Sequence, residues 1–274
     1  MIDTGKINTE KRNPNTMNID KLPTNEMVAL MHRESKQAFD AIDDVLPEVA
    51  KAVDKIAEAF DNGGHLYYIG AGTSGRIGVL DASECPPTFG VPDTLVVGII
   101  AGGDSALRKS SEGAEDSEEN GYKEIIDRKL NENDVLVGIA ASGRTPYVAG
   151  AMKAARELGA VTVSITSTPG SYIDTLADIK LSCNTGPEVV TGSTRLKSGT
   201  AQKLIVNMLS TCAMIKTGKV YENLMINVSA SNEKLKTRAA GITSEILNIS
   251  REEAFALLEK NNFSIREAIA AYGK

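Results

Sequence analysis

Tryptophan is absent from this chain, and histidine and cysteine are scarce. The two histidines, His32 and His65, are far apart in the sequence, so they do not form the closely spaced clusters that bind structural zinc. The three cysteines, Cys85, Cys183 and Cys212, are an odd number and contain no C-x-x-C pair. Such cysteines fit a reducing compartment better than a disulfide framework. We therefore expect no metal site, and each histidine is expected to be a packed or surface residue.

Long apolar runs and an excess of basic residues are also missing. No stretch reaches the length of a membrane-spanning helix, and the polar N-terminus lacks the apolar centre of a secretory signal. The 30 basic and 36 acidic residues give a formal charge of -6, which argues against a protein that binds the nucleic-acid backbone. These absences predict a cytoplasmic protein without nucleic-acid or membrane partners. A protein of this charge must bind a phosphate locally, through backbone N–H groups and hydroxyls.

What the chain does contain is an alternation of short apolar runs with helical segments. The apolar runs lie at positions 65–69, 95–101, 135–141, 161–166 and 179–183. Apolar residues recur at helical spacing between them, notably at 117–130 and 146–158. This alternation predicts an α/β fold in which helices flank both faces of a doubly wound parallel sheet.

The chain divides into three predicted parts. Residues 1–24 form a polar N-terminal arm, of a kind that is often disordered unless a partner or neighbouring subunit holds it. Residues 25–219 form the α/β domain, which begins with two helices separated by Pro47. Its last helix, at 196–216, should bury one stripe of residues: Leu204, Ile205, Met208, Leu209, Cys212 and Ile215. Residues 220–274 are predicted to be a small, all-helical appendage with a capping box at 250–253.

Two of the predicted strands end in related loops. The first is followed by G-A-G-T-S-G-R at 70–76 and the third by A-A-S-G-R-T at 140–145, so both place Ser-Gly-Arg between a strand and a helix. Small residues let the backbone approach a ligand, hydroxyls add donors, and the following helix supplies free N–H groups. A single such loop could equally be a tight turn, but two of them at the carboxyl ends of strands predict a phosphate site.

Other nucleotide-type loops fit less well. Residues 70–75 satisfy G-x-G-x-x-G, yet the second run ends in Ala101-Gly102-Gly103 and offers no acidic residue for a ribose. A Walker A loop is excluded, because no Gly-Lys-Ser/Thr follows the glycines. A dinucleotide site is therefore the weaker alternative.

At these loops the sequence resembles the sugar isomerase (SIS) domain, an α/β module that binds phosphosugars. The run GAGTSGRIGVLDASECPPTFG at 70–90 resembles the N-acetylmuramic acid 6-phosphate etherases. So do residues 100–103, 112–117, 138–148 (GIAASGRTPYV) and 188–203 (EVVTGSTRLKSGTAQK). The resemblance covers nearly the whole chain and implies a SIS-type sheet, a phosphosugar substrate and no cofactor.

The resemblance also implies a reaction, in which the D-lactyl ether of N-acetylmuramic acid 6-phosphate is cleaved to N-acetylglucosamine 6-phosphate and D-lactate. An ether resists direct displacement because its leaving alkoxide is strongly basic. In the ring-opened sugar, however, the C2 proton is α to an aldehyde and the lactyl oxygen on C3 is β to it. Elimination followed by addition of water then requires two carboxyl groups in opposite protonation states.

Carried over from the family, these carboxyl groups are Glu84 and Glu115. Glu84, placed just after the first loop's helix, matches the acid that protonates the lactyl oxygen. Glu115, in an acidic run at 112–119, matches the second catalytic glutamate, which we assign as the base at C2. Spacing alone does not select either residue, since an arbitrary glutamate at either place would be a solvated side chain.

The loops and one later segment supply the expected substrate contacts. By motif these are Gly72, Thr73, Ser74, Ser142, Gly143, Thr145 and Ser193. Thr194 and Lys197 are further candidates. Arg76 and Arg144 either approach the phosphate or brace their own loops.

Two other functions stay open on this fold. A phosphosugar isomerase also needs a base near C2, although the S-E-C-P-P segment at 83–87 favours the etherase. A non-catalytic sugar-phosphate sensor, like the glucokinase regulatory proteins, shares the fold, but this chain is far shorter. A transcription regulator is disfavoured by the acidic N-terminal half and the polar arm. SIS domains usually pair, so we expect a homodimer with sites near the subunit interface.

Overall fold

The structure is a computed structural model that describes residues 8–109, 111, 113–227 and 232–273. The first seven residues of the predicted arm and Glu112 of the acidic run lie outside this part of the chain.

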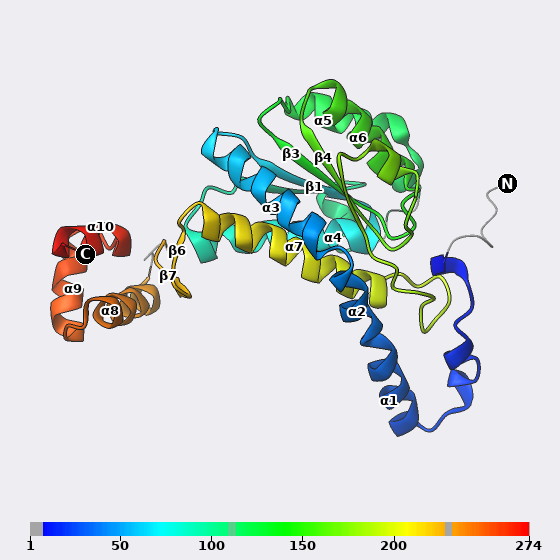
Figure 1. Cartoon of the computed structure of the whole chain (residues 1–274), viewed down its shortest axis with the longest axis horizontal. Coiled ribbons are helices and arrows are strands. Elements are labelled where there is room, and N and C mark those ends of the chain that lie inside the picture. The colour runs from blue at the N-terminus through cyan, green and yellow to red at the C-terminus, as the bar shows by residue number, and fades with distance from the viewer. Residues whose placement is uncertain (1–7, 110, 112, 228–231, 274) are drawn as a thin grey trace.

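A five-stranded parallel sheet lies at the centre of the molecule (Figure 1), with the strand order β2-β1-β3-β4-β5. The strands are β1 (Leu66–Gly70), β2 (Val96–Ile100), β3 (Val135–Ile139), β4 (Val161–Thr166) and β5 (Ile179–Ser182). All of β3 is buried, as expected of a strand that is covered on both faces. The predicted fold class is confirmed, and each predicted apolar run contains a strand.

Helices cover both faces of the sheet. On one face lie α3 (Leu46–Asp61), α4 (Gly72–Phe89) and α7 (Lys197–Lys216), which share a core with Val137. On the other face lie α5 (Glu118–Arg128) and α6 (Pro146–Glu157), which share a core with Leu136. Since successive side chains of a strand point to opposite faces, one apolar run supplies both cores.

The buried face of α7 differs from the predicted stripe. Ile205 and Leu209 are fully buried, but Cys212 is exposed and Ile215 is 47% exposed. Ala213 and Met214 are buried in the same stretch. The helix packs against both α3 and α4, so its buried surface is wider than a single stripe. Near its C-terminal end, the buried surface includes positions outside the predicted stripe.

The N-terminal segment and the first two helices project from the body of the molecule (Figure 1). They are α1 (Thr24–Ser35) and α2 (Gln37–Asp43), preceded by 3₁₀ turns at Asn8–Glu10, Pro14–Thr16 and Ile19–Lys21. Contacts within the chain hold the described part of the arm, because Asn13 Nδ2 donates to the carbonyl of Pro187 and Thr16 Oγ1 to that of Val189. The predicted boundary at Pro47 is confirmed, since α2 ends at Asp43 and α3 begins at Leu46, but the first predicted helix is divided into α1 and α2. Pro47 lies in the first turn of α3, where its missing N–H costs nothing.

The C-terminal region is not all-helical, which corrects the prediction for its start. Residues after α7 form a short antiparallel hairpin of β6 (Val220–Tyr221) and β7 (Leu224–Met225). The helices α8 (Glu233–Leu247), α9 (Arg251–Lys260) and α10 (Ile265–Tyr272) follow and share an apolar core of their own. The predicted capping box is confirmed, with Ser250 and Glu253 bonding each other's backbone N–H. The division of the chain at residue 219 stays a prediction.

The remaining short elements are 3₁₀ turns in the loops, at Asp104–Leu107, Ala114–Asp116 and Ile173–Leu176. None of the helices within the described ranges has both the length and the apolar character that crossing a membrane requires.

Candidate active site

The two Ser-Gly-Arg loops lie side by side at one edge of the sheet. They follow β1 and β3, which are direct neighbours. The second loop lies between β3 and α6 as predicted, but only Ala71 separates β1 from α4, so Ser74-Gly75-Arg76 belongs to the first turns of that helix. Residues 71–76 are still called the first loop below. In this strand order, the connections from β1 and β3 leave towards opposite sides of the sheet. Such a switch point leaves a crevice at the carboxyl ends of the two strands, where ligands of open α/β sheets bind. Two helix N-termini with free N–H groups therefore meet at the place where the sequence predicts a phosphate.

The first loop packs against the N-terminal part of α7. Gly72 has a φ of +52° and begins α4. Ser74 is buried, and its Oγ donates to Oε1 of Gln202 at 3.0 Å. A Cβ on Gly199 would lie 3.4 Å from the Cγ2 of Thr73, so the start of α7 lies against this loop. Sequence reasoning missed Gln202, because its partner Ser74 is 128 positions away and no local pattern joins them.

Arg76 braces the next loop of the sheet. Its Nε donates to the carbonyl of Leu107 at 3.0 Å and its Nη2 to that of Ala106 at 2.6 Å. The guanidinium therefore braces the loop after β2 and not, as was predicted, its own loop.

The second loop depends on a left-handed glycine. Gly143 has a φ of +63°, and a Cβ there would lie 2.1 Å from the hydroxyl of Ser171. The turn lets Ser142 Oγ accept from the backbone N–H of Arg144 at 3.4 Å and places Thr145 at the N-cap position of α6. Ser142 and Thr145 are half-buried beside the first loop, whereas Arg144 is exposed.

Glu115 lies next to the first loop. It is exposed on the 3₁₀ turn Ala114–Asp116 and lines a cavity of about 150 Å³ together with Gly72 and Arg76. The loop after β2 therefore brings this carboxylate to the same edge of the sheet as the predicted phosphate site.

Glu84 lies elsewhere, within α4 rather than just after it. Pro86 and Pro87 are part of the last turns of this helix, which continues to Phe89. Twelve residues separate Glu84 from Gly72, which corresponds to about 18 Å along a helix. A single chain therefore does not bring Glu84 together with Glu115 and the two loops.

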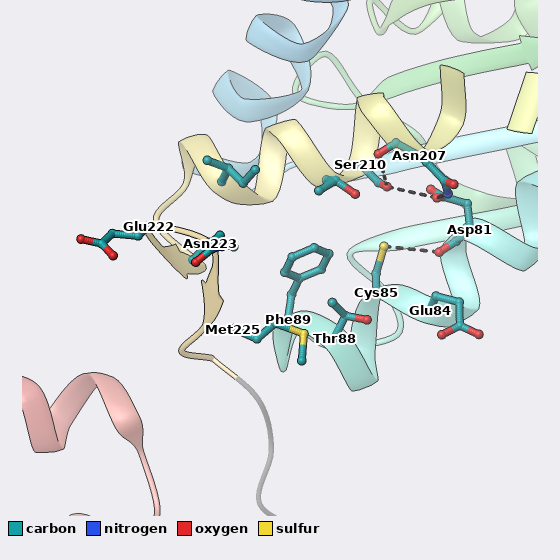
Figure 2. Close-up of a pocket in the computed structure, with 13 residues that line it drawn as sticks. Asp81, Glu84, Cys85, Thr88, Phe89, Asn207, Ser210, Glu222, Asn223 and Met225 are labelled. Carbon is teal, nitrogen blue, oxygen red and sulfur yellow. Dashed lines mark hydrogen bonds between the residues drawn. The ribbon is translucent and has the colours of Figure 1, made fainter. Parts of the chain in front are cut away.

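Around Glu84, α4, α7 and the β6–β7 hairpin enclose a cavity of about 390 Å³. Figure 2 shows Asp81 pointing to Asn207 and Ser210 of α7, whereas Glu84 points away from α7. The carboxyl oxygen Oδ1 of Asp81 accepts from Asn207 Nδ2 at 2.6 Å and from Ser210 Oγ at 3.1 Å. Burial raises the pKa of Asp81 even though these hydrogen bonds lower it.

The thiol of Cys85 lines the same cavity. Burial, with the nearby charge of Asp81 as a smaller cause, raises its pKa to about 12. This thiol therefore stays protonated and unreactive at neutral pH.

The segment before α7 carries Ser193, Thr194 and Lys197. Ser193 and Thr194 are half-buried in the loop, whereas Lys197 is buried and its ammonium group is bonded to residues of α1 and α2. It donates to Glu34 at 3.3 Å and to Gln37 at 2.6 Å in a buried cluster.

The buried Glu188 caps α7, since its two oxygens accept from the N–H groups of Lys197 and Ser198 at 2.9 and 3.0 Å. This helix start is therefore already occupied by a carboxylate, unlike those of α4 and α6.

Among the described residues, no group of three or more histidine, cysteine, aspartate or glutamate side chains could hold a metal ion. The polar groups at the two loops are hydroxyls, glycine backbone, the guanidinium groups of Arg76 and Arg144, and the carboxylate of Glu115.

Comparison with protein-family models gives two matches. The N-terminal SIS domain of glucokinase regulatory protein matches residues 48–156, and the SIS domain matches residues 109–212.

Solved structures share the fold at low identity. A phosphoheptose isomerase from Francisella tularensis superposes with a TM-score of 0.54 at 20% identity, covering 71% of this chain and 100% of that one. The phosphoheptose isomerase GmhA from Neisseria gonorrhoeae gives a TM-score of 0.52 at 20% identity, covering 70% and 98%. These similarities support the SIS-type fold.

Curated relatives are much more similar in sequence. The N-acetylmuramic acid 6-phosphate etherase of Clostridium beijerinckii is 54% identical over 263 residues, covering 96% of this chain and 86% of the relative. The enzyme of that name from Glaesserella parasuis is 57% identical over 260 residues, covering 94% and 86%. At this identity over nearly its full length, the chain belongs to the family of N-acetylmuramic acid 6-phosphate etherases.

Proposed function

We propose that this protein cleaves the D-lactyl ether of N-acetylmuramic acid 6-phosphate, releasing N-acetylglucosamine 6-phosphate and D-lactate in the recycling of cell-wall amino sugars. The observation that carries the proposal is the identity of more than half of the aligned residues with relatives of that name. The two adjacent loops and the carboxylate of Glu115 beside them provide the chemistry that this reaction needs.

The reaction proceeds by elimination and then addition. In the ring-opened substrate, a base removes the proton from C2, and the C3–O bond breaks with its electron pair leaving on the lactate oxygen. An acid gives that oxygen its proton. Water then adds across the resulting double bond, with its hydroxyl at C3 and a proton at C2. The net change is hydrolysis of the ether, with no change in oxidation state.

Glu115 serves as the base and Glu84 as the acid in this scheme. Glu115 is exposed next to the first loop, where its side chain can reach a sugar held by its phosphate. Glu84 is exposed on α4, at the margin of the cavity that this helix forms with α7 and the β6–β7 hairpin. The reaction requires these two groups in opposite protonation states.

The phosphate is held between the two loops. Thr73 and Ser74 at the start of α4, and Ser142 and Thr145 before α6, supply hydroxyls, while Gly72 and Gly143 let the backbone approach. We assign Ser193, in the loop before α7, to the same site. Because both helix starts carry free N–H groups, a net-acidic protein can bind an anion here.

We further propose that the protein is a homodimer in which each site takes Glu84 from one subunit and Glu115 from the other. The separation of about 18 Å along α4 supports this arrangement, because one sugar phosphate cannot reach both ends of that distance within one chain. Apolar side chains exposed on the projecting segment also support it. They are Met17, Val28, Met31 and Phe39.

A cytoplasmic location fits the state of the cysteines. All three are free thiols, and two of them, Cys85 and Cys183, are buried. Free thiols are typical of proteins in a reducing compartment.

The two alternative functions are less well supported. An isomerase would use the same loops, but the isomerases in the structural comparison are only 20% identical. A sensor of the glucokinase regulatory type is suggested by one domain match over residues 48–156, whereas the etherase relatives match nearly the whole chain.

Incubation with N-acetylmuramic acid 6-phosphate in deuterated water tests the reaction. We expect lactate release with deuterium at C2 of the product, and loss of lactate release in Glu84→Gln and Glu115→Gln. Exchange of the C2 proton of added product should survive in Glu84→Gln and disappear in Glu115→Gln, which assigns the base. If the folded wild-type protein releases no lactate, the etherase proposal is wrong.

A further inference from the structure

The side chain of Gln202 lies behind the first loop and has no role in the scheme above. It is on α7, only 1% exposed, and its Oε1 accepts the hydrogen bond from Ser74. The helices touch at this point, since Gly199, one turn earlier on α7, lies against Thr73. A buried amide is thus the neighbour of a hydroxyl that belongs to the proposed phosphate site.

The amide nitrogen of Gln202 is unsatisfied. Within the part of the chain that the structure describes, Nε2 has no hydrogen-bond partner although it is buried. Buried polar groups are nearly always paired, because an unpaired donor loses its hydrogen bond to water and gains nothing in return. This orientation of the amide is therefore unfavourable by itself.

The direction of the bond between Ser74 and Gln202 also affects anion binding. A serine hydroxyl has one proton, and here that proton is given to Oε1. It cannot be donated to a phosphate oxygen at the same time. A half-turn of the amide would bring Nε2 to the hydroxyl instead, and Nε2–H would then donate to Oγ. The serine proton would be released to a ligand, and the orphaned donor would gain a partner.

We propose that Gln202 is a positioning residue of the phosphate site, whose amide reverses when a phosphate monoester binds so that Ser74 donates to the ligand. The proposal rests on the phosphosugar-binding function proposed above. It concerns the binding step alone, so inorganic phosphate is a sufficient probe.

Three variants separate this role from simple packing. In Gln202→Glu the side chain, when ionised, can only accept, so it retains the serine proton and adds a negative charge. Its affinity for phosphate should fall by about 100-fold. Gln202→Leu and Ser74→Ala should each weaken binding by about 10-fold. The double variant Gln202→Leu/Ser74→Ala should be no weaker than Ser74→Ala alone, because the amide acts through that hydroxyl.

Ser210→Ala is the matched control. Ser210 also makes a hydrogen bond between α7 and α4, to Asp81 at 3.1 Å, but eight residues further along α7. This variant should lower the melting temperature and leave the Kd for phosphate unchanged. A role of Gln202 in helix packing alone would give the same pattern for Gln202→Leu, and that result would overturn the proposal.

The decisive experiment combines calorimetry with NMR on the full chain. Inorganic phosphate and N-acetylglucosamine 6-phosphate are titrated into each protein, and the side-chain amide signal of Gln202 is identified by its loss in Gln202→Leu. We expect that signal to shift on saturation with phosphate. An unshifted signal, or additive losses in the double variant, would refute the reversal, and absence of phosphate binding in the wild type would refute the site itself. Lactate release is measured in a separate assay, so a failure of the etherase proposal can be distinguished from a failure of the Gln202 proposal.

Discussion

The buried ion pair of Lys197 and Glu34 illustrates how a residue in a functional motif can serve the fold. Lys197 is 1% exposed and Glu34 is 5% exposed, and the pair joins the start of α7 to α1 and the arm. Asn13 and Asn15 donate two further hydrogen bonds to Glu34, at 2.6 and 2.9 Å. Removing one member would leave the other charge buried without compensation, which typically costs about 3–5 kcal/mol.

Glu34→Gln should lower the free energy of unfolding by about 3 kcal/mol at neutral pH. Burial raises the pKa of Glu34, but the hydrogen bonds from the two asparagines and the charge of Lys197 outweigh it and lower this pKa overall. The stabilisation is thus present above the unfolded-state pKa of about 4.3 and lost as pH falls through the lower folded-state value. Urea unfolding from pH 7 to pH 3 should show the two proteins converging. A constant difference would contradict the assignment.

At the scale of secondary-structure elements, the N-terminus of α7 is capped by a single carboxylate from the preceding loop. Glu188 is 0% exposed and accepts from two of the first N–H groups of this 20-residue helix. Its removal would leave two buried donors without partners and release the loop that carries Ser193.

Glu188→Ala should therefore destabilise the protein by about 2–4 kcal/mol, whereas Glu188→Gln, which keeps one acceptor oxygen, should cost about half as much. Thermal and urea unfolding of the three proteins would measure the order. Equal stability of the alanine variant and the wild type would show that water or another group caps α7 instead.

The elements that local pattern determines were predicted well, and those that depend on distant neighbours were not. The strand at 161–166 and the capping box of α9 match the structure, because both follow from residues close in sequence. The exposed end of α7 was missed because its burial depends on α3 and α4. The bounds of α4 were missed because Pro86 and Pro87 remain helical near its end. The loop after β3 was placed correctly, whereas most of the predicted loop after β1 belongs to α4. Gln202 and Glu188 could not be found without the packing of α7.

For the whole molecule, the projecting segment with exposed apolar side chains predicts association. Val28 is 60% exposed on α1, so Val28→Glu should leave the chain folded while weakening a dimer that buries this surface. Tyr272→Glu, at a side chain 53% exposed on α10, is the control that should not affect it. Sedimentation at micromolar concentration measures both. A monomeric wild type would exclude the dimer.

A dimer with shared sites makes a further prediction, because two inactive variants should restore each other. When Glu84→Gln and Glu115→Gln subunits are mixed and exchange freely, about half of the dimers are mixed ones. In each mixed dimer, one site receives both substitutions and the other receives both native glutamates. Lactate release should therefore recover to about a quarter of the wild-type rate per subunit. If each site were built within one chain, every site in a mixed dimer would lack one glutamate. Mixing would then restore nothing, and Glu84 would have to reach the substrate by a movement of α4 itself.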